Sequence, residues 1–292
     1  MRVGTRESGL AMKQTELLIA AMRAAGHDTE YEIVGIKAMG DADQTSPLDG
    51  FGDVGAFVRE LDDALLRGEI DISVNSLKDI PVGIDPRLEV AAVMRRDPCE
   101  DAILPCALED LPAGASVGTS SVRRAAQIRE ARPDLEVEPL RGNIHTRLAK
   151  LDAGGYDAIV LARAGLERMG IDRPMAVLDP DVFVPAAAQG AIAVECRADD
   201  RETAGMLAAV DDAETRACVM LERAIMNAMG AGCSSPVGIN AVIVDGGIRV
   251  RAVSYGFAAA AIRLDTVLPR EPDAAAIQAA ADHLAGGKGA RG

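Results

Sequence analysis

The chain has 292 residues, 49% of them hydrophobic, and a formal net charge of −14. This length favours about two to three compact units, and this composition excludes an intrinsically disordered chain. The negative charge opposes binding to nucleic acid or to acidic membranes, and no apolar run approaches the roughly 20 residues that span a bilayer. Because the N-terminus carries no apolar signal segment, we expect a cytoplasmic protein.

The cysteines and basic residues narrow the chemistry further. Five cysteines form no Cys-x-x-Cys pair, so neither a disulfide framework nor a metal site is expected. The basic residues are 26 Arg and 5 Lys. Arginine binds carboxylate or phosphate through a planar fork of two donors that lysine lacks. The positions of the arginines are therefore informative.

The first part of the chain alternates between strand and helix patterns. Strands are predicted over residues 2–5, 31–36 and 70–74. Ser8 can cap a helix that ends at Gly26, and residues 57–66 carry the pattern of an amphipathic helix. Residues 40–55 are rich in Gly and Asp, and we expect them to form a mobile loop.

A second alternating region follows residues 95–98. Its predicted strands cover 116–118, 135–140, 158–162 and 191–196, and its predicted helices cover 122–131, 144–151 and a segment near Gly165. Such alternation favours parallel α/β sheets. A helix over 214–229, a hairpin of 237–244 with 248–253 and a helix over 273–284 predict a final small α+β unit, and we expect the tail 286–292 to be disordered.

Hydroxyl and basic residues gather at two predicted strand-to-helix turns. The first turn holds Thr119, Ser120, Ser121, Arg123 and Arg124, and the second holds Arg141, Gly142, Asn143 and Arg147. Helix N-termini present free N–H groups, and ligands of doubly wound sheets bind beyond the carboxyl ends of the strands. The first turn alone could equally be an ordinary helix cap with solvated arginines. Together the two turns predict an arginine-lined cleft for a small polyanion, which Arg6 could join from the first domain.

Two further positions suggest chemistry. Asp79 follows a predicted strand and precedes Ile80-Pro81, so we expect it to be extended and ionised among the arginines. It could stabilise a cation or move a proton, but on these residues alone a structural salt bridge is favoured. Cys233 lies between glycines and Ser-Ser-Pro, which indicates either an accessible thiol or a turn cysteine without function.

Taken together, these stretches resemble the hydroxymethylbilane synthase family, also called porphobilinogen deaminase, over nearly the whole chain. The matching motifs occur in order along the sequence. They include Thr5-Arg6-Glu7-Ser8, Phe57-Val58-Arg59-Glu60-Leu61, Ser76-Leu77-Lys78-Asp79-Ile80-Pro81, Gly118-Thr119-Ser120-Ser121-Val122-Arg123-Arg124, Leu140-Arg141-Gly142-Asn143, Gln189-Gly190-Ala191 and Gly232-Cys233.

The resemblance implies an α/β architecture of two doubly wound domains like those of periplasmic binding proteins, plus a small C-terminal α+β domain. The expected boundaries are 1–93 with 188–209 for the first domain, 94–187 for the second and 210–292 for the third. Members of the family are typically monomeric. The resemblance also implies a dipyrromethane cofactor that is held by Cys233 through a thioether.

The implied activity is a transferase of tetrapyrrole biosynthesis. Four porphobilinogen molecules are joined head to tail on the cofactor with release of ammonia, and hydrolysis then frees linear hydroxymethylbilane. Asp79 would be the catalytic residue, stabilising the cationic azafulvene left when ammonia departs. Besides Cys233, the expected cofactor-binding residues are Ser76, Lys78, Asp79, Thr119, Ser121, Arg123, Arg124 and Arg147. The expected substrate-binding residues are Arg6, Gln14, Ser120, Arg141, Gly142, Asn143, Arg168 and Gln189.

Some positions depart from the usual family pattern. Asn75 stands where many members have His, Val54 stands where a loop Lys is common, and Arg163 has no assigned role. Two other protein classes share this architecture. A two-domain binding or effector-sensing protein for an organic acid would need neither Asp79 nor Cys233. A phosphoribosyl-type transferase would need a phosphate loop or an acidic metal site, and no such motif occurs in the sequence.

Overall fold

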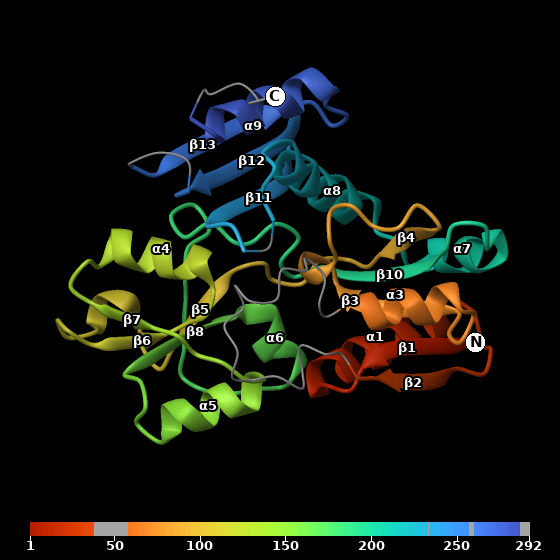
Figure 1. Cartoon of the computed structure of the whole chain (residues 1–292), viewed down its shortest axis with the longest axis horizontal. Coiled ribbons are helices and arrows are strands. Elements are labelled where there is room, and N and C mark those ends of the chain that lie inside the picture. The colour runs from red at the N-terminus through yellow and green to blue at the C-terminus, as the bar shows by residue number, and fades with distance from the viewer. Residues whose placement is uncertain (38–57, 233, 257–259, 287–292) are drawn as a thin grey trace. The chain divides into compact units, whose positions relative to one another are not determined.

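The computed structural model describes residues 1–37, 58–232, 234–256 and 260–286 (Figure 1). No helix within these ranges is long and apolar enough to cross a membrane. The chain divides into two compact units, one made of Met1–Asp97 and Gly190–Arg216, the other of Pro98–Gln189 and Ala217–Gly292. The finer division into three domains stays a prediction.

The first unit is built on a five-stranded sheet in the order β2-β1-β3-β10-β4. The strands are β1 (Arg2–Arg6), β2 (Glu32–Ile36), β3 (Ile72–Ser76), β4 (Leu88–Val93) and β10 (Ile192–Arg197). β1 runs parallel to β2 and β3, whereas β10 runs antiparallel to both β3 and β4. The predicted parallel pairing holds for β1 with β2 and β3, and the sheet is mixed because β10 enters it from the returning chain without a helical crossover.

Helices cover both faces of this sheet. Val3 lies in one buried cluster with Leu18 and Met22 of α1 (Gly9–Ala24). The next residue, Gly4, faces the other way, where an added Cβ would meet Ile70 at 2.2 Å and Leu61 of α3 (Arg59–Leu66) at 3.1 Å. Successive strand residues point to opposite faces, so α1 and α3 lie on opposite sides and the sheet is doubly wound. Two short helices, α7 (Arg201–Leu207) and η4 (Ala208–Val210), follow β10.

The second unit repeats this plan in a sheet of order β7-β6-β8-β5-β9. The strands are β5 (Asp101–Leu104), β6 (Ser116–Gly118), β7 (Glu136–Glu138), β8 (Ala158–Ala162) and β9 (Ala176–Val177), and a short helix η3 (Leu108–Asp110) follows β5. β6 is parallel to β7 and β8, whereas β5 is antiparallel to β8 and β9.

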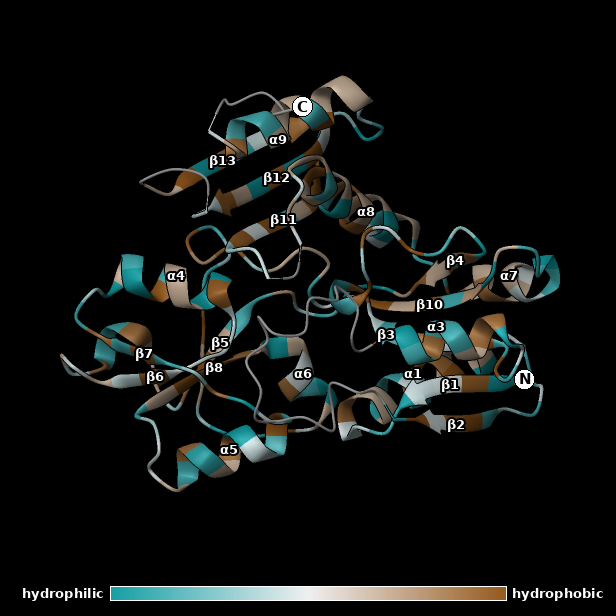
Figure 2. Cartoon of the chain, viewed as in Figure 1, coloured by the Kyte–Doolittle hydropathy of each residue, from teal (hydrophilic) through white to brown (hydrophobic). Residues whose placement is uncertain are grey.

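Alternation along β8 separates the two faces of this second sheet. Val160 packs in a cluster with Ile128 of α4 (Val122–Ala131), whereas its neighbour Ile159 packs with Leu148 of α5 (Ile144–Asp152) and Leu166 of α6 (Arg163–Arg168). Figure 2 shows both hydrophilic and hydrophobic colours on α4 and α5, as expected for helices with one buried side.

A smaller antiparallel sheet completes the second unit. It contains β11 (Val237–Val244), β12 (Gly247–Ser254) and β13 (Ile262–Leu268), accompanied by α9 (Ala274–Leu284) and by the part of α8 (Ala213–Ala228) that follows Arg216. The predicted hairpin of β11 and β12 is confirmed, and β13 is an addition. The expected fold class, two doubly wound sheets with a small α+β part, is confirmed.

Candidate active site

Asp79 lies just beyond the carboxyl end of β3, in the short 3-10 helix η2 (Leu77–Asp79). Leu77 is fully buried and fixes this turn, and the backbone N–H of Ile80 donates to the carbonyl of Leu77 at 3.3 Å. The prediction that Asp79 is extended is therefore wrong. The restriction that Pro81 imposes acts on its immediate neighbour Ile80, which is extended, and not on Asp79.

The Asp79 side chain lines a pocket of the first unit. The pocket is formed by residues from the end of β1, the start of α1, the end of β3 and η2, and the polar ones are Arg6, Ser8, Gln14, Asn75, Ser76 and Asp79. Ser8 caps α1 by accepting from the Ala11 N–H at 3.3 Å, as predicted. Gln14 is buried and donates to the Ser76 hydroxyl at 2.8 Å. The structure thus gathers Arg6, Gln14, Ser76 and Asp79 in one pocket.

The Asp79 carboxylate is half-buried and makes no hydrogen bond or ion pair with any residue in the described ranges. The alternative that Asp79 forms a structural salt bridge therefore finds no support there. A half-buried carboxylate without a protein partner is available to a ligand that carries N–H donors or positive charge.

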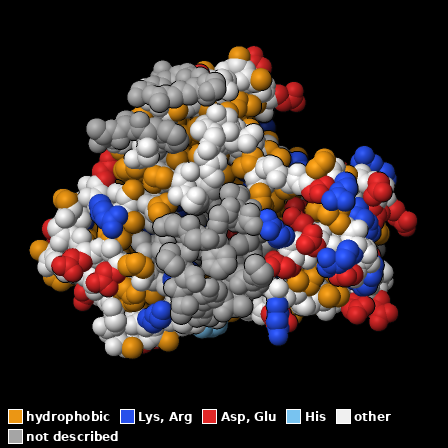
Figure 3. All heavy atoms as spheres, viewed as in Figure 1, with side chains coloured by type: hydrophobic (Ala, Val, Ile, Leu, Met, Phe, Trp, Pro, Cys, Tyr) orange, Lys and Arg blue, Asp and Glu red, His pale blue; other side chains and the backbone are white. Residues whose placement is uncertain are grey.

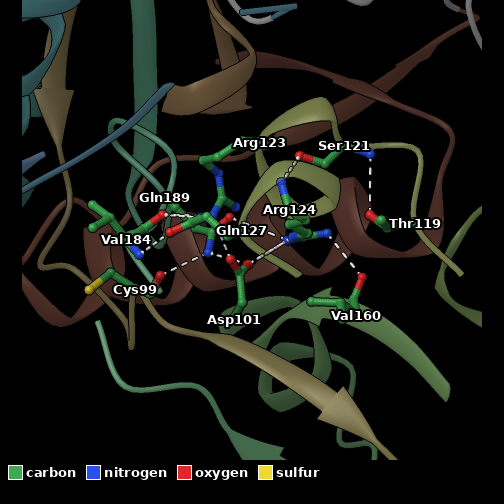
Figure 4. Close-up of polar contacts among 10 residues, drawn as sticks. All are labelled: Cys99, Asp101, Thr119, Ser121, Arg123, Arg124, Gln127, Val160, Val184 and Gln189. Carbon is green, nitrogen blue, oxygen red and sulfur yellow. Dashed lines mark hydrogen bonds and ion pairs between the residues drawn. The ribbon is translucent and has the colours of Figure 1, made fainter. Parts of the chain in front are cut away.

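The second unit holds a contrasting acidic residue, Asp101, at the start of β5 (Figure 4). Asp101 is fully buried. Its Oδ1 accepts from Arg124 Nη2 at 2.7 Å and from Gln189 Nε2 at 2.8 Å, and its Oδ2 lies 2.7 Å from Arg123 Nη1. The two guanidinium groups hold the pKa of the Asp101 carboxyl far below its usual range, although burial opposes this shift.

Arg123 and Arg124 were expected to bind the cofactor, and both are 7% exposed or less. Besides Asp101, Arg123 donates to the Val184 carbonyl at 2.7 Å, and Arg124 donates to the Val160 carbonyl at 3.1 Å. Burial lowers the pKa of the Arg123 guanidinium, the pairing with Asp101 partly offsetting it. The structure therefore commits much of both side chains to the protein, and their contact with a cofactor stays a prediction.

Gln189 belongs to the same buried cluster. It is 1% exposed, and its amide nitrogen donates to the Cys99 carbonyl at 2.8 Å as well as to Asp101. The preceding residue, Ala188, has a φ of 60°, an uncommon value for a residue other than glycine. Its N–H donates at 2.6 Å to the fully buried Glu222, whose other oxygen accepts from Ala241. Glu222 thus holds the backbone next to Gln189.

Sequence reasoning missed both Asp101 and Glu222. Neither acid lies in a recognisable motif, and their partners are distant along the chain. One signal was available for Asp101, because two consecutive arginines in the first turn of a buried helix require a nearby counter-charge.

The turn before α4 carries the predicted hydroxyl residues. Ser121 caps the helix by accepting from the Arg124 N–H at 3.4 Å, and Thr119 accepts from the Ser121 N–H at 3.2 Å. Ser120 instead donates to the Leu140 carbonyl at 2.7 Å. Since a serine has one hydroxyl hydrogen, Ser120 has used its donor on the protein, whereas the contact of Ser121 leaves its hydrogen available.

The turn before α5 presents an arginine in an unusual setting. Asn143 caps α5 by accepting from the Thr146 N–H at 2.9 Å, and Gly142 has a φ of +113°, where an added Cβ would lie 2.7 Å from Thr146. Arg147 Nε donates to the Gly142 carbonyl at 2.7 Å. Burial, together with the charge of Arg124, lowers the pKa of Arg147 to about 10, and no described acidic residue pairs with it. This cation therefore lacks a counter-charge within the described protein.

The remaining predicted residues are more scattered. Three predicted basic residues are half-buried. Lys78 lies in η2, Arg141 lies just before α5, and Arg168 lies in the last turn of α6. Arg163 pairs with Glu167 at 2.7 Å and with Glu100 at 3.6 Å, which gives it a structural role. Cys233, Val54 and the loop 40–55 lie outside the described residues.

On the face shown in Figure 3, basic and acidic side chains lie interspersed over the first unit. Within the described ranges, no group of three or more His, Cys, Asp or Glu residues could hold a metal ion. Within the described residues, the first unit offers a carboxylate without a protein partner, Asp79, and the second offers an arginine without an acidic partner, Arg147.

Comparison with solved structures gives low similarity. The periplasmic VFT2 domain of Bordetella pertussis BvgS aligns at 13% identity and a TM-score of 0.41, over 72% of this chain and 86% of that one. A periplasmic binding protein from Brucella ovis with glutathione bound aligns at 16% identity and a TM-score of 0.42, over 79% of this chain and 68% of that one. Scores this low carry no argument about ligands.

Comparison of sequences is far more specific. The porphobilinogen deaminase of Acidothermus cellulolyticus is 50% identical over 261 residues, which cover 87% of this chain and 78% of the relative. That of Xanthomonas oryzae pv. oryzae is 48% identical over 241 residues, covering 81% and 79%. The family model described as "Porphobilinogen deaminase, dipyromethane cofactor binding domain" matches residues 1–205, and that of the C-terminal domain matches residues 216–255. The chain belongs to the porphobilinogen deaminase family.

Proposed function

We propose that the chain is a hydroxymethylbilane synthase, a transferase that joins four porphobilinogen molecules into linear hydroxymethylbilane for tetrapyrrole biosynthesis. Family membership over residues 1–205 and 216–255 carries this conclusion. The alternative of a two-domain binding protein would leave the Asp79 pocket and its unpartnered carboxylate without a use.

The family's cofactor is a dipyrromethane, and the second unit contains a residue that fits it. Each pyrrole of such a cofactor carries carboxylate side chains. Arg147, short of a counter-charge and made less basic by burial and by Arg124, would gain one from such a carboxylate. The available hydroxyl of Ser121 supports the same conclusion. When bound, the dipyrromethane supplies the pyrrole carbon to which the first substrate unit is joined.

We assign the attachment of this cofactor to Cys233 through a thioether. The residues proposed to hold its carboxylates and pyrrole N–H groups are Ser76, Lys78, Asp79, Thr119, Ser121, Arg123, Arg124 and Arg147. Arg123 and Arg124 together carry two positive charges, and their shared partner Asp101 offsets only one of them. The remaining positive charge would attract the carboxylates of the cofactor.

Asp79 is the proposed catalytic residue. In each condensation the aminomethyl C–N bond of porphobilinogen breaks, ammonia leaves, and the new C–C bond forms as the attacked pyrrole carbon loses its proton. The departing ammonia leaves a cation on the substrate, and an ionised carboxylate stabilises such a cation directly. Since Asp79 has no described protein partner, it is free to accept the pyrrole N–H or the proton in transit.

The growing product accumulates carboxylates, which need basic partners. Arg6 lines the Asp79 pocket, and the other proposed substrate-binding residues are Gln14, Ser120, Arg141, Gly142, Asn143, Arg168 and Gln189. We also propose that the enzyme acts as a cytoplasmic monomer. Sedimentation of the holoenzyme at a mass near 30.4 kDa would support the monomer, and a stable dimer would contradict it.

Intact-protein mass spectrometry combined with a turnover assay tests the function. The purified protein should exceed its sequence mass by one dipyrrole, should give colour with an acidic aldehyde reagent, and should convert porphobilinogen to hydroxymethylbilane. Replacement of Cys233 by Ser should abolish the added mass. An unmodified protein that is fully active would overturn the cofactor assignment, and a modified protein without turnover would overturn the activity.

A further inference from the structure

A buried polar network lies directly behind the Asp79 pocket. Glu195 of β10 is fully buried and stands opposite Ser73 of β3 in the sheet register. Its Oε2 accepts from the Asn75 amide nitrogen at 3.0 Å and from the Ser73 hydroxyl at 3.3 Å, and the same amide nitrogen lies 3.2 Å from Ser73 Oγ. Three polar side chains on one face of the sheet are thus joined.

This network fixes the orientation of the Asn75 amide. The structure places the amide nitrogen of Asn75, Nδ2, 3.0 Å from Glu195 Oε2, where it donates a hydrogen bond. The reverse orientation would set two acceptor oxygens against each other. Both hydrogens of the amide nitrogen are directed to Glu195 and Ser73, which leaves the carbonyl oxygen Oδ1 as the group that Asn75 offers elsewhere.

The only polar atom that Asn75 has left over is therefore an acceptor, and Asn75 lines the same pocket as Asp79. No residue in the described ranges donates a hydrogen bond to Asn75 Oδ1. Asn75 and Asp79 thus line one pocket, and an amide oxygen and a carboxylate are two acceptors that match a ligand group with several N–H donors.

Charge favours a cationic donor over a neutral one. A hydrogen bond from the amide nitrogen to Glu195 Oε2 polarises the amide and increases the negative charge on its oxygen. Electrostatic interactions are stronger in a buried setting than in water, and Glu195 is fully buried. A protonated amine near Asn75 would experience this field together with the charge of Asp79.

We propose that Asn75 binds the protonated aminomethyl group of porphobilinogen through Oδ1, and that Glu195 positions the Asn75 amide for this contact. The inference rests on the proposed function, and it assigns the recognition of the leaving group to a residue next to the catalytic Asp79. It is a binding contact only, in which no covalent bond changes.

The test compares two ligands of the holoenzyme. One is porphobilinogen, and the other is an unreactive analogue in which a methyl group replaces the aminomethyl group. Asn75→Ala should raise the KM for porphobilinogen about 10–100-fold, as expected for loss of a hydrogen bond to a charged group, while leaving the inhibition constant of the methyl analogue nearly unchanged. Equal weakening of both ligands would overturn the proposal, because a structural defect would not distinguish them.

Two variants keep the test informative if Asn75→Ala folds poorly. Neutral histidine can donate one ring N–H to Glu195 and present its other ring nitrogen as an acceptor, so Asn75→His should retain the preference for porphobilinogen. Loss of that preference in a folded Asn75→His protein would contradict the inference. Glu195→Gln keeps the shape of the network but replaces the carboxyl acceptor of the Asn75 amide, and it should raise the KM less than Asn75→Ala.

The outcome also separates this inference from the proposed function. A wild-type holoenzyme that does not consume porphobilinogen would remove the function itself. A wild-type enzyme that is active, with variants that weaken both ligands alike, would remove only the role of Asn75.

Discussion

Asp79 and Asp101 are the same kind of residue in opposite settings. Asp79, just beyond β3 in the first unit, is half-buried and has no hydrogen-bond or ion-pair partner within the described residues. Asp101, at the start of β5 in the second unit, is fully buried and held by two arginines and Gln189. The protein itself pairs the Asp101 carboxylate, whereas it leaves the Asp79 carboxylate without a partner. Asp101 is therefore expected to govern stability, and Asp79 is expected to govern turnover.

The largest expected effect is on catalysis, through Asp79→Asn. This change removes the negative charge while keeping the shape, so turnover should fall by about 10²–10⁴-fold, the range of a lost general acid or base. The melting temperature should hardly change, because no described protein contact is lost. Steady-state kinetics with calorimetry on the same preparation checks both. Turnover within tenfold of the wild type would remove Asp79 from the mechanism.

The second effect is on stability, through Asp101→Asn. Removal of this charge leaves Arg123 and Arg124 buried without a counter-charge, which should cost about 3–5 kcal/mol of unfolding free energy. Denaturant unfolding, with Asp79→Asn as the matched control, measures it. If both variants unfolded at the same denaturant concentration, the contrast between the two aspartates would not hold.

The same contrast predicts a pH dependence. The folded-state pKa of Asp101 is lowered, so its contribution to stability is present above its unfolded pKa of about 3.9 and is lost as pH falls toward the folded value. The wild type should therefore lose stability below about pH 4 more steeply than Asp101→Asn. Parallel slopes of unfolding free energy against pH would show that Asp101 does not titrate in this way.

The smallest effect concerns Arg147. Its lowered pKa means that the fold disfavours the charged side chain at pH values below about 10. Arg147→Met should therefore leave the melting temperature of the cofactor-free protein equal or raise it. In the holoenzyme it should weaken binding of the carboxylate-bearing chain by about tenfold, the loss of one charge-assisted contact. Destabilisation of the cofactor-free protein would show that Arg147 has a structural partner instead.

Local signals allowed much of the fold to be predicted from sequence. The helix starts at Ser8, Ser121 and Asn143 follow from side chains that accept the free N–H groups of the first turn. The β11–β12 hairpin follows from the turn residues between two apolar runs. β13 was missed although Ile262 and Leu264 alternate with charged residues, so its pattern could have revealed it.

Other features could not be read locally. The antiparallel insertion of β10 depends on pairing between segments more than a hundred residues apart. The partners of Asp101, Glu195 and Glu222 are equally distant, because each acid meets them only through tertiary packing. Family motifs therefore predicted Asp79 and the arginines as site residues, which stays a prediction, and gave no sign of the buried acids that hold the groups around them.

The central position of β10 has a consequence for synthesis of the chain. β10 pairs with both β3 and β4, yet it emerges from the ribosome about 100 residues after β4, roughly 5–20 s later at ordinary rates of translation. The strands of the five-stranded sheet in the second unit lie within residues 101–177 and are all translated before β10. During that interval the nascent chain exposes the edges of β3 and β4, which makes this the stage at which a chaperone would matter most.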